Sequence, residues 1–375
     1  MHTISKKIYI IAGEASGDLH GANLMKALKA EDPSVQFRFW GGDKMLQQDT
    51  HLVKHIRDLA FMGFVEVLSN LKTIIRNIAF CKKDIDLFQP DALVLIDYPG
   101  FNLRIAEWAK AKGIKVVYYI SPQVWAWKQS RVHKIKRFVD KMYVILPFEK
   151  AFYKQFDFDV TYFGHPLLDA VEEYKNNAPS RHAFLTKHGL SDKPILAILP
   201  GSRKQEISVK LPIMLEALKD FTNYQLIVAG APSLDPSFYL PYATENVHTI
   251  FGETYAILSS AEAAVVTSGT ATLETALLGI PEVVCYKGSA ISYRIAKRLI
   301  KIKYISLVNL IMDQLVVKEL IQEDCSPENI RQEVLKITRG GVGREAMLKS
   351  YEVMKQKLGD EGVSKKVAHS LLKTI

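Results

Sequence analysis

The feature that most limits how this chain can fold is a repeated pattern: a short apolar run rich in β-branched residues, a turn of small residues, then a helical segment. The apolar runs occupy residues 7–13, 90–96, 114–120, 194–199, 224–229, 263–267 and 282–286. Continuous apolar runs are typical of strands buried on both faces, and strands that alternate with helices form parallel sheets. The sequence therefore predicts an α/β protein in which helices cover parallel sheets.

Length and one polar stretch predict how this pattern divides. The chain has 375 residues, more than a single ordinary core of about 150 residues. Residues 172–181 read EEYKNNAPSR, which is the composition of an exposed connection. We therefore predict a first domain over 1–170, a second over 171–345, and helices over 346–375 that return to the first domain. A ligand is expected at the carboxyl ends of the strands, in a cleft between the two sheets.

The charge balance favours an anionic partner. The sequence holds 49 Lys and Arg against 40 Asp and Glu, a net charge of +9. This excess suits a nucleotide, an anionic lipid surface or a nucleic acid, although a solvated basic surface explains it equally well. No apolar stretch approaches the roughly 18 residues of a transmembrane helix, which leaves attachment to a membrane surface open.

A first motif in the second half predicts an anion site. Residues 199–204 read LPGSRK directly after a predicted strand. Ser202 would offer a reachable backbone amide there, and Arg203 a guanidinium. A tight turn that carries a surface arginine is the alternative.

A second motif in the same half strengthens this prediction. Residues 267–274 read TSGTATLE, so Ser268, Gly269 and Thr270 open a helix whose first amides attract phosphate. Glu274, about one turn into the helix, could accept the hydroxyls of a ribose. Ordinary helix capping is the alternative. GxGxxG and Walker motifs are absent, so dinucleotide oxidoreductases and P-loop ATPases lose support.

Carboxylates, in contrast, follow the strands of the first half. Glu14, Ser16 and Asp18 lie in the turn GEASGD, where the two acids would repel phosphate and suit a neutral, hydroxylated substrate. Asp97 directly follows the apolar strand 93–96, where burial would raise its proton affinity. We predict Asp97 as a general base, and a cap of the following turn is the alternative.

An aromatic and basic segment follows the next strand. Trp125 precedes a run of Lys, Arg and His that includes Arg131, which indicates a sugar site or an interface. RNA binding uses the same residue types, but no RRM, KH or helix-turn-helix pattern accompanies them, so no nucleic acid is expected. His165 ends a further strand, where a structural and a functional role are equally plausible.

The sequence predicts no metal site. Asp84 with Asp86 and Asp157 with Asp159 form Asp-x-Asp pairs, but both pairs read as solvated surface. The three cysteines lie far apart without metal-ligand spacing, which predicts neither a zinc site nor a disulfide framework and fits a reducing cytosol.

Two segments favour a membrane surface. The first, residues 61–68, presents Met62, Phe64, Val65 and Leu68. In the second, residues 293–310, five basic residues alternate with Ile, Leu and Tyr. Both segments could instead be ordinary core helices.

Taken together, the motifs resemble the lipid-A-disaccharide synthase family. The resemblance runs in order from about residue 7 to about residue 330. It is carried by AGEASGDLHGA (12–22), MGFVEVL (62–68), IDYPGFN (96–102), the block from SPQVWAWKQ to FEKAFY (121–153), FGHP (163–166), LPGSR (199–203), SGTATLE (268–274) and YISLVNLI (304–311).

The resemblance implies a two-domain GT-B fold and an inverting glycosyl transfer that needs no metal or cofactor. The donor would be UDP-2,3-diacylglucosamine and the acceptor 2,3-diacylglucosamine 1-phosphate, joined to a β-1,6 disaccharide phosphate at the cytoplasmic face of the bacterial inner membrane. By the same resemblance Asp97 is the essential aspartate, and Arg203 and Asn309 belong to the donor side. The acidic turn with Glu14 and Asp18 is assigned to the acceptor side by resemblance and position, and Arg131 is a candidate for the acceptor phosphate by its charge alone. Ser16, Trp125 and His165 are further candidates on the acceptor side. A homodimer is a further possible partner state.

The chain departs from the family at two places. It reads Tyr98-Pro-Gly100 where the family has Ala-Pro-Asp, and Val308 where the family has proline before Asn309. Neither change touches Asp97 or the SGT helix start, so the expected reaction class is unaffected.

Two other functions fit the same sequence. A UDP-sugar 2-epimerase of the same fold would also bind a nucleotide diphosphate at a small-residue helix start, without any need for a membrane. A non-catalytic membrane scaffold would use the basic and apolar segments and leave Asp97 as a cap.

Overall fold

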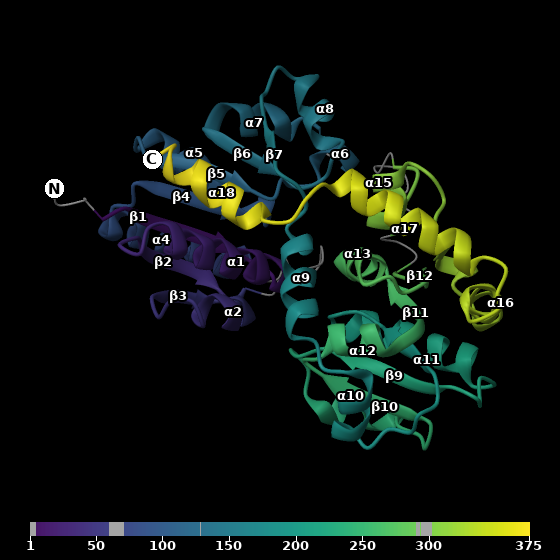
Figure 1. Cartoon of the computed structure of the whole chain (residues 1–375). Helices are drawn as coiled ribbons and strands as arrows, with labels where there is room; N and C mark the ends of the chain where they lie inside the picture. Colours follow the sequence, from purple (N-terminus) through teal and green to yellow (C-terminus); the bar gives the residue numbers. More distant parts are fainter. Residues whose placement is uncertain (1–4, 60–70, 128, 290–292, 294–301) are drawn as a thin grey trace. The chain divides into compact units, whose positions relative to one another are not determined.

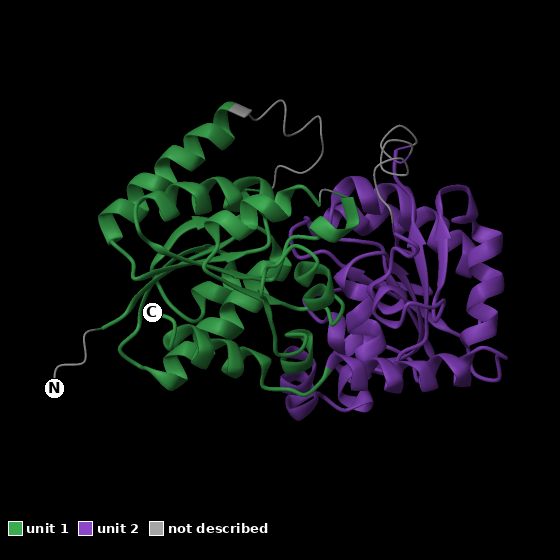
Figure 2. Cartoon of the chain, turned by 90° about the horizontal axis from the view of Figure 1, so that it is seen from above, with its two compact units in different colours: residues 1–169, 359–375 green, residues 170–358 purple. Residues whose placement is uncertain are grey.

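The computed structural model describes residues 5–59, 71–127, 129–289, 293 and 302–375. The chain forms two compact units, coloured separately in Figure 2. Unit 1 comprises Met1–Asp169 and Gly359–Ile375, and unit 2 comprises Ala170–Leu358. Each unit is built on one parallel sheet, so the predicted α/β class with two parallel sheets is confirmed.

Unit 1 contains a seven-stranded sheet in the order β3-β2-β1-β4-β5-β6-β7. Its strands are β1 (Lys7–Ala12), β2 (Gln36–Gly41), β3 (Leu52–His55), β4 (Ala92–Ile96), β5 (Lys115–Tyr119), β6 (Lys141–Val144) and β7 (Thr161–Tyr162). The chain builds outward from β1 to β3, then restarts beside β1 with β4. The strand order therefore reverses between β1 and β4, where a crevice for a ligand normally opens in such sheets.

The helices of unit 1 cover both faces of this sheet. They are α1 (Ala15–Glu31), α2 (Asp43–Leu46), α4 (Leu71–Phe88), α5 (Pro99–Ala111), α6 (Val124–Trp127), α7 (Arg131–Phe138), α8 (Glu149–Lys154), the start of α9 (Leu167–Asn177) and α18 (Val363–Leu372), with a 3-10 turn η1 at Ile56–Asp58. Alternate residues of β1 enter different cores: Tyr9 packs with α5 and α7, and Ile10 with α1 and α18. Figure 1 shows α18 lying beside α1.

Unit 2 repeats this topology with six strands in the order β10-β9-β8-β11-β12-β13. The strands are β8 (Ile195–Leu199), β9 (Gln225–Gly230), β10 (Val247–Phe251), β11 (Ala261–Thr267), β12 (Glu282–Tyr286) and β13 (Lys318–Ile321). Its helices are α10 (Arg181–Lys187), α11 (Lys204–Leu218), α12 (Thr254–Ser260), α13 (Thr270–Leu277), α15 (Leu307–Met312), α16 (Pro327–Ile337) and α17 (Arg344–Leu358), with 3-10 turns η2 (Pro236–Tyr242) and η3 (Gln322–Asp324). Here the order reverses between β8 and β11.

The first predicted domain boundary, after residue 170, lies one residue from the observed division, whereas the second moves from residue 346 to Gly359. The polar stretch 172–181 is not a loop throughout, because α9 continues to Asn177, and the units divide within this helix after Asp169. The chain returns to unit 1 at Gly359 rather than at residue 346, because α17 buries Tyr351 and Met354 and belongs to unit 2. The polar stretch predicts a loop, but a polar sequence is equally typical of an exposed helix face.

The returning tail is fastened by Asp169. Its Oδ1 accepts the amides of Gly362 and Val363 at 2.7 and 3.1 Å, and its Oδ2 accepts that of Ser364 at 2.7 Å. A carboxylate at a helix N-terminus satisfies amides that have no partner within the helix. Asp169 thereby fixes the start of α18 in unit 1.

The membrane predictions receive little information from the structure. Met62, Phe64, Val65 and Leu68 lie outside the described residues, as do residues 294–301. Within the described part of the chain, no helix has the length and apolar character needed to cross a membrane.

Candidate active site

Both reversal points carry a predicted motif. In unit 1, Gly13 and Glu14 follow the end of β1, and Asp97 follows the end of β4. In unit 2, residues 200–203, which we call the phosphate turn, follow β8, and residues 268–270 follow β11. The carboxyl ends of adjacent parallel strands lie at the same edge of a sheet, so each pair of motifs is brought together within its unit.

Asp97 lies in an unusual backbone conformation. Its φ is 44° and that of Tyr98 is 47°, so two successive non-glycine residues are left-handed. Each such residue costs roughly 1 kcal/mol or more and persists only where its surroundings hold it. Strain of this kind at the end of a central strand is typical of a functional turn.

Two buried side chains hold this turn. Asn102 of α5 donates from Nδ2 to the carbonyl oxygens of Ile96 at 3.2 Å and Asp97 at 2.8 Å. The hydroxyl of Tyr118, from β5, also donates to the Asp97 carbonyl. The main chain of Asp97 is thus fixed by two donors, which restricts where its carboxylate can point. Neither residue could be predicted from the sequence, because nothing in the local pattern around Asn102 or Tyr118 marks it.

The surroundings raise the pKa of Asp97 to about 7, mainly through burial and secondly through the charge of Glu14. A carboxylate is most effective as a general base when its pKa lies near the working pH. A helix-capping role fits less well, because Tyr98, and not Asp97, is the N-cap of α5. The environment of Asp97 therefore suits proton abstraction.

The end of β1 approaches Asp97 through Tyr98. A Cβ on Gly13 would stand 2.4 Å from Cγ of Tyr98, so the ring of Tyr98 rests on the backbone of Gly13. The same ring stacks on Phe101 with centroids 5.4 Å apart. Glu14 is partly buried beside this contact, and its charge raises the pKa of both Asp97 and Tyr98. Glu14 is therefore at the candidate site, as predicted from its motif.

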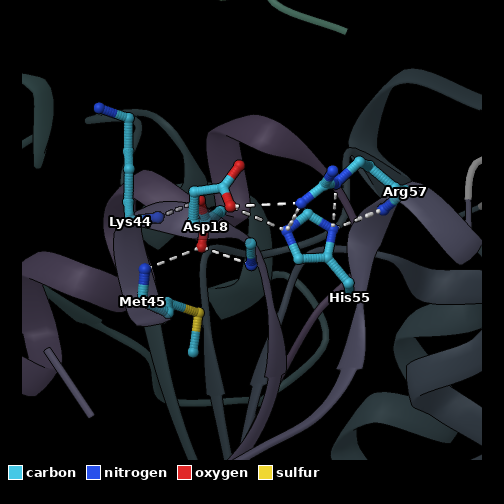
Figure 3. Close-up of polar contacts among 7 residues, drawn as sticks. Asp18, Lys44, Met45, His55 and Arg57 are labelled. Atoms are coloured by element: carbon cyan, nitrogen blue, oxygen red, sulfur yellow. Dashed lines mark hydrogen bonds and ion pairs between the residues drawn. The ribbon is translucent and has the colours of Figure 1, made fainter. Parts of the chain in front are cut away.

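Asp18 has a different role. It is buried, and its Oδ1 accepts the amides of Gly42 at 2.6 Å and Met45 at 3.1 Å, while Oδ2 accepts that of Lys44 at 3.0 Å. Figure 3 shows these contacts, with His55 and Arg57 nearby. Asp18 thus caps α2, a structural use of a carboxylate that the motif had assigned to the acceptor. Ser16 lies partly buried in the first turn of α1.

The remaining acceptor candidates are spread over unit 1. Trp125 is partly buried and packs edge-on against Phe148, with centroids 4.9 Å apart. The guanidinium of Arg131 lies over the ring of Trp127 at 5.1 Å. His165 is buried, its Nδ1 accepts the amide of Leu167 at 3.2 Å, and burial lowers its pKa to about 3. Nδ1 of His165 thus serves the start of α9, whereas its buried Nε2 has no hydrogen-bond partner among the described residues.

The helix start in unit 2 matches its prediction in detail. Helix α13 begins at Thr270 with Gly269 as N-cap, and no side chain caps it within the described chain. Ser268 is oriented elsewhere, because its Oγ donates to the carbonyl of Ile305 at 3.0 Å. The amides of Thr270 and Ala271 therefore have no partner among the described residues and could bind an anion. Further along, Glu274 accepts a hydrogen bond from the hydroxyl of Tyr255 at 2.9 Å, which orients its carboxylate.

The phosphate turn carries an exposed cation. Ser202 and Arg203 are both exposed, and Arg203 Nη1 lies 3.0 Å from Oε1 of Glu206. Exposed pairs of this kind contribute only about 0–1 kcal/mol, so Arg203 can exchange this partner for a ligand.

Asn309 is used entirely within the protein. It is buried, its Nδ2 donates to Val317 O and Glu319 Oε1, both at 2.9 Å, and its Oδ1 accepts the amides of Val316 and Val317 at 2.7 and 2.9 Å. Glu319 in turn accepts the amide of Ile305. Asn309 thus supports the backbone that receives Ser268, so it acts behind the predicted donor site.

The described residues contain no group of three or more His, Cys, Asp and Glu side chains placed to hold a metal ion. The prediction that both Asp-x-Asp pairs lie on the solvated surface is wrong for Asp84, however. Asp84 is not solvated: it is buried, its Oδ2 accepts from Tyr9 at 2.7 Å, and it binds Arg38 through both oxygens. Asp157 and Asp159 are exposed, as predicted.

Comparison with known proteins agrees with the motifs. The lipid-A-disaccharide synthetase family model matches residues 8–371. The lipid-A-disaccharide synthase of Syntrophus aciditrophicus is 43% identical, covering 97% of this chain and 96% of that protein. That of Trichlorobacter lovleyi is 39% identical, covering 99% of this chain and 98% of that protein.

Among solved structures, the UDP-GlcNAc 2-epimerase of Neisseria meningitidis has a TM-score of 0.68 at 14% identity, covering 98% of this chain and 100% of that chain. The glycosyltransferase of kitacinnamycin has a TM-score of 0.67 at 12% identity, covering 99% of both chains. These two likenesses establish the GT-B type of fold and nothing about activity. The family model and the relatives identify the lineage: this chain belongs to the lipid-A-disaccharide synthase family.

Proposed function

We propose that this chain joins a UDP-linked diacylglucosamine to diacylglucosamine 1-phosphate, forming the β-1,6-linked disaccharide 1-phosphate and UDP. Family membership supports the reaction, and the environment of Asp97 carries the assignment of its base. A partly buried carboxylate with a pKa of about 7 follows a central strand of unit 1, on a turn held by two buried donors.

In this proposal unit 1 activates the acceptor. Asp97 accepts the proton of the acceptor's 6-hydroxyl while that oxygen attacks the anomeric carbon of the donor. The bond from the anomeric carbon to the UDP oxygen breaks in the same displacement, which inverts the configuration. Glu14 keeps the pKa of Asp97 raised. The acidic surroundings also favour the neutral hydroxyl group over a phosphate at this position.

Unit 2 binds the donor. The first amides of α13 and the guanidinium of Arg203 stabilise the charge that develops on the leaving UDP. Glu274, oriented by Tyr255, accepts the ribose hydroxyls. The proposed reaction requires no metal or cofactor, as the family resemblance implies.

The first test is direct. Purified protein is incubated with both lipid substrates, and UDP release and disaccharide formation are followed for the wild type, Asp97→Asn and Asp157→Asn. Asp157 is a matched control, because it too is left-handed, with φ at 52°, but exposed. Disaccharide formed by the wild type and the control, and lost in a folded Asp97→Asn, supports the proposal.

The competing functions give different outcomes. Turnover of UDP-N-acetylglucosamine without a lipid acceptor would indicate an epimerase. Unchanged function in Asp97→Asn would indicate a scaffold in which Asp97 has no chemical role.

We also propose that the protein works at the cytoplasmic face of the inner membrane. Helix α7 presents His133, Lys134, Lys136 and Arg137 as exposed basic residues, which would attract anionic headgroups. Residues 61–68 would enter among the acyl chains. The protein should cosediment with anionic vesicles at low salt and be released at high salt, and Phe64→Glu should weaken binding. Absence of binding at low salt contradicts this part, and sedimentation velocity tests the expected homodimer.

A further inference from the structure

The phosphate turn is already occupied by a negative group. A Cβ on Gly201 would stand 2.7 Å from Oε2 of Glu206, so the carboxylate lies directly against the turn. The other oxygen of Glu206 pairs with Arg203 at 3.0 Å. The glycine leaves a space that an anion can enter, and in this structure Glu206 fills it. A donor diphosphate that uses this turn and Arg203 must therefore displace Glu206.

One helical turn further along α11 lies a buried cation, Lys210. Lys210 is only 2% exposed, and across the described residues its ammonium makes no hydrogen bond or ion pair. Its surroundings include the buried thiols of Cys285 and Cys325. Burial lowers the pKa of Lys210, and the charge of Glu206 opposes this effect. An unpaired buried ammonium is costly, so a carboxylate that reached it would be stabilised.

The helical spacing allows that contact. Residues four apart on a helix lie on the same face, within reach of one another, so Glu206 can turn from the phosphate turn toward Lys210. To reach Lys210, Glu206 would have to leave its ion pair with Arg203. The side chains of Arg203 and Glu206 are 47% and 32% exposed in that pair. Such pairs are weak, so the exchange needs little free energy.

We propose that Glu206 competes with the donor nucleotide for the phosphate turn and for Arg203. When the nucleotide binds, Glu206 leaves Arg203 and pairs with Lys210 instead. In the empty protein Glu206 pairs with Arg203 and covers the phosphate turn. When the donor diphosphate binds, Arg203 pairs with phosphate and Glu206 pairs with Lys210. This inference rests on the proposed function, because it assumes that the phosphate turn receives the donor.

The test measures UDP affinity by titration calorimetry. Glu206→Gln removes the competing charge and should bind UDP about two- to fivefold more tightly, the effect of removing one weak exposed pair. Glu216→Gln is the matched control, because Glu216 forms the same i,i+3 pair with Lys219 on the same helix, away from the turn. This control should leave UDP affinity unchanged.

A double-mutant cycle tests the exchange itself. Lys210→Met removes the second partner of Glu206 and should weaken UDP binding about two- to fivefold in the wild-type background. In the Glu206→Gln background the same change should have no effect. Because Lys210→Met also removes a buried unpaired charge, it should not lower the melting temperature.

Three results would overturn the inference. Unchanged UDP affinity in Glu206→Gln with a lower melting temperature would make Glu206 a purely structural cap. Equal weakening by Lys210→Met in both backgrounds would mean that Lys210 acts on the nucleotide directly. Absence of UDP binding by the wild type would refute both the donor site of the proposed function and this inference. Normal UDP binding by the wild type that does not change in Glu206→Gln would refute the inference alone.

Discussion

The two sheets have the same topology and opposite chemistry at the same place. In unit 1 the strands beside the reversal point lead into Glu14 and Asp97, two carboxylates whose negative charges repel each other. In unit 2 the corresponding strands lead into small residues, open helix amides and Arg203. The topology determines where a ligand can bind, and the few residues after each strand determine which ligand is accepted.

Each arrangement excludes the other's ligand for a simple reason. A second carboxylate beside Asp97 raises its proton affinity, which helps a base and repels phosphate. Amides and a guanidinium lower the energy of an anion, and they would keep a nearby carboxylate ionised and weakly basic.

Removal of the acid from unit 1 should stop the chemistry and leave donor binding intact. Asp97→Asn should lower kcat by about 10²- to 10⁴-fold, because a general base contributes that much. UDP affinity, measured by calorimetry, should remain unchanged, since unit 2 supplies that site. A parallel loss of UDP binding in a folded Asp97→Asn protein would contradict the separation of roles.

The pH dependence should report the same carboxylate. Because the pKa of Asp97 is raised to about 7, kcat/KM should fall about tenfold per unit below that pH, as the base becomes protonated. Between the ordinary carboxyl pKa and about 7 the folded state holds a proton that the unfolded state has lost. The contribution of Asp97 to stability should therefore decline as the pH rises through this window.

This stability effect can be measured apart from activity. Denaturant unfolding of the wild type and Asp97→Asn, compared from pH 4 to pH 8, isolates the contribution of the carboxyl group. A difference between the two proteins that does not vary with pH would show that the pKa of Asp97 is not raised.

Removal of the Arg203 guanidinium from unit 2 should have the opposite effect to Asp97→Asn, because it should weaken UDP binding. Arg203→Ala should weaken UDP binding about tenfold, the typical loss of one hydrogen bond to a charged group. Arg331→Ala is the control, because Arg331 is also an exposed arginine of unit 2, paired with Asp220 at 3.1 Å. Equal effects of the two substitutions would mean that only net charge matters.

The two buried hydrogen-bond donors of unit 1, Asn102 and Tyr118, should affect catalysis by positioning Asp97. Tyr118→Phe removes one of the two hydrogen bonds to the Asp97 carbonyl and should lower kcat about three- to tenfold with little change in KM. The acid limb of the pH profile should move to lower pH, because a less restrained Asp97 is better hydrated. Tyr143→Phe, which loses a hydroxyl contact to Ser370 at 2.9 Å, should change only the melting temperature. If both variants change only stability, Tyr118 has no positioning role.

The smallest effect is expected where the chain departs from its family. A Cβ on Gly100 would meet no atom within 4 Å, so Gly100→Asp fits the first turn of α5. Replacement of a helical glycine and an acid near the helix start should together raise the free energy of unfolding by about 0.5–1 kcal/mol. A third carboxylate should also move the acid limb of kcat/KM upward. Destabilisation would show that the turn after β4 tolerates no further charge.

The sequence located the candidate motifs correctly in the fold where a motif directly follows a strand. The helix start at Thr270, the phosphate turn and Asp97 all lie at strand ends, because an apolar run and its first polar residue are adjacent in the chain. It failed where a motif residue serves a distant segment. Asp18 binds the backbone of residues 42–45, and Asn309 binds that of residues 316 and 317. A conspicuous motif does not reveal whether a side chain faces a ligand or the backbone.

The local sequence was enough to predict the two parallel sheets, the acidic turns that follow strands of unit 1 and the small-residue turns that follow strands of unit 2, because these depend on residues that are neighbours along the chain. Four features became visible only in the folded chain: Tyr118 and Asn102 hold the main chain of Asp97, burial and Glu14 raise the pKa of Asp97, Glu206 lies against the phosphate turn, and Lys210 is buried. Most of these contacts join different strands and helices. Their energies depend on burial and distance, and both quantities are set only when the sheets and helices have packed.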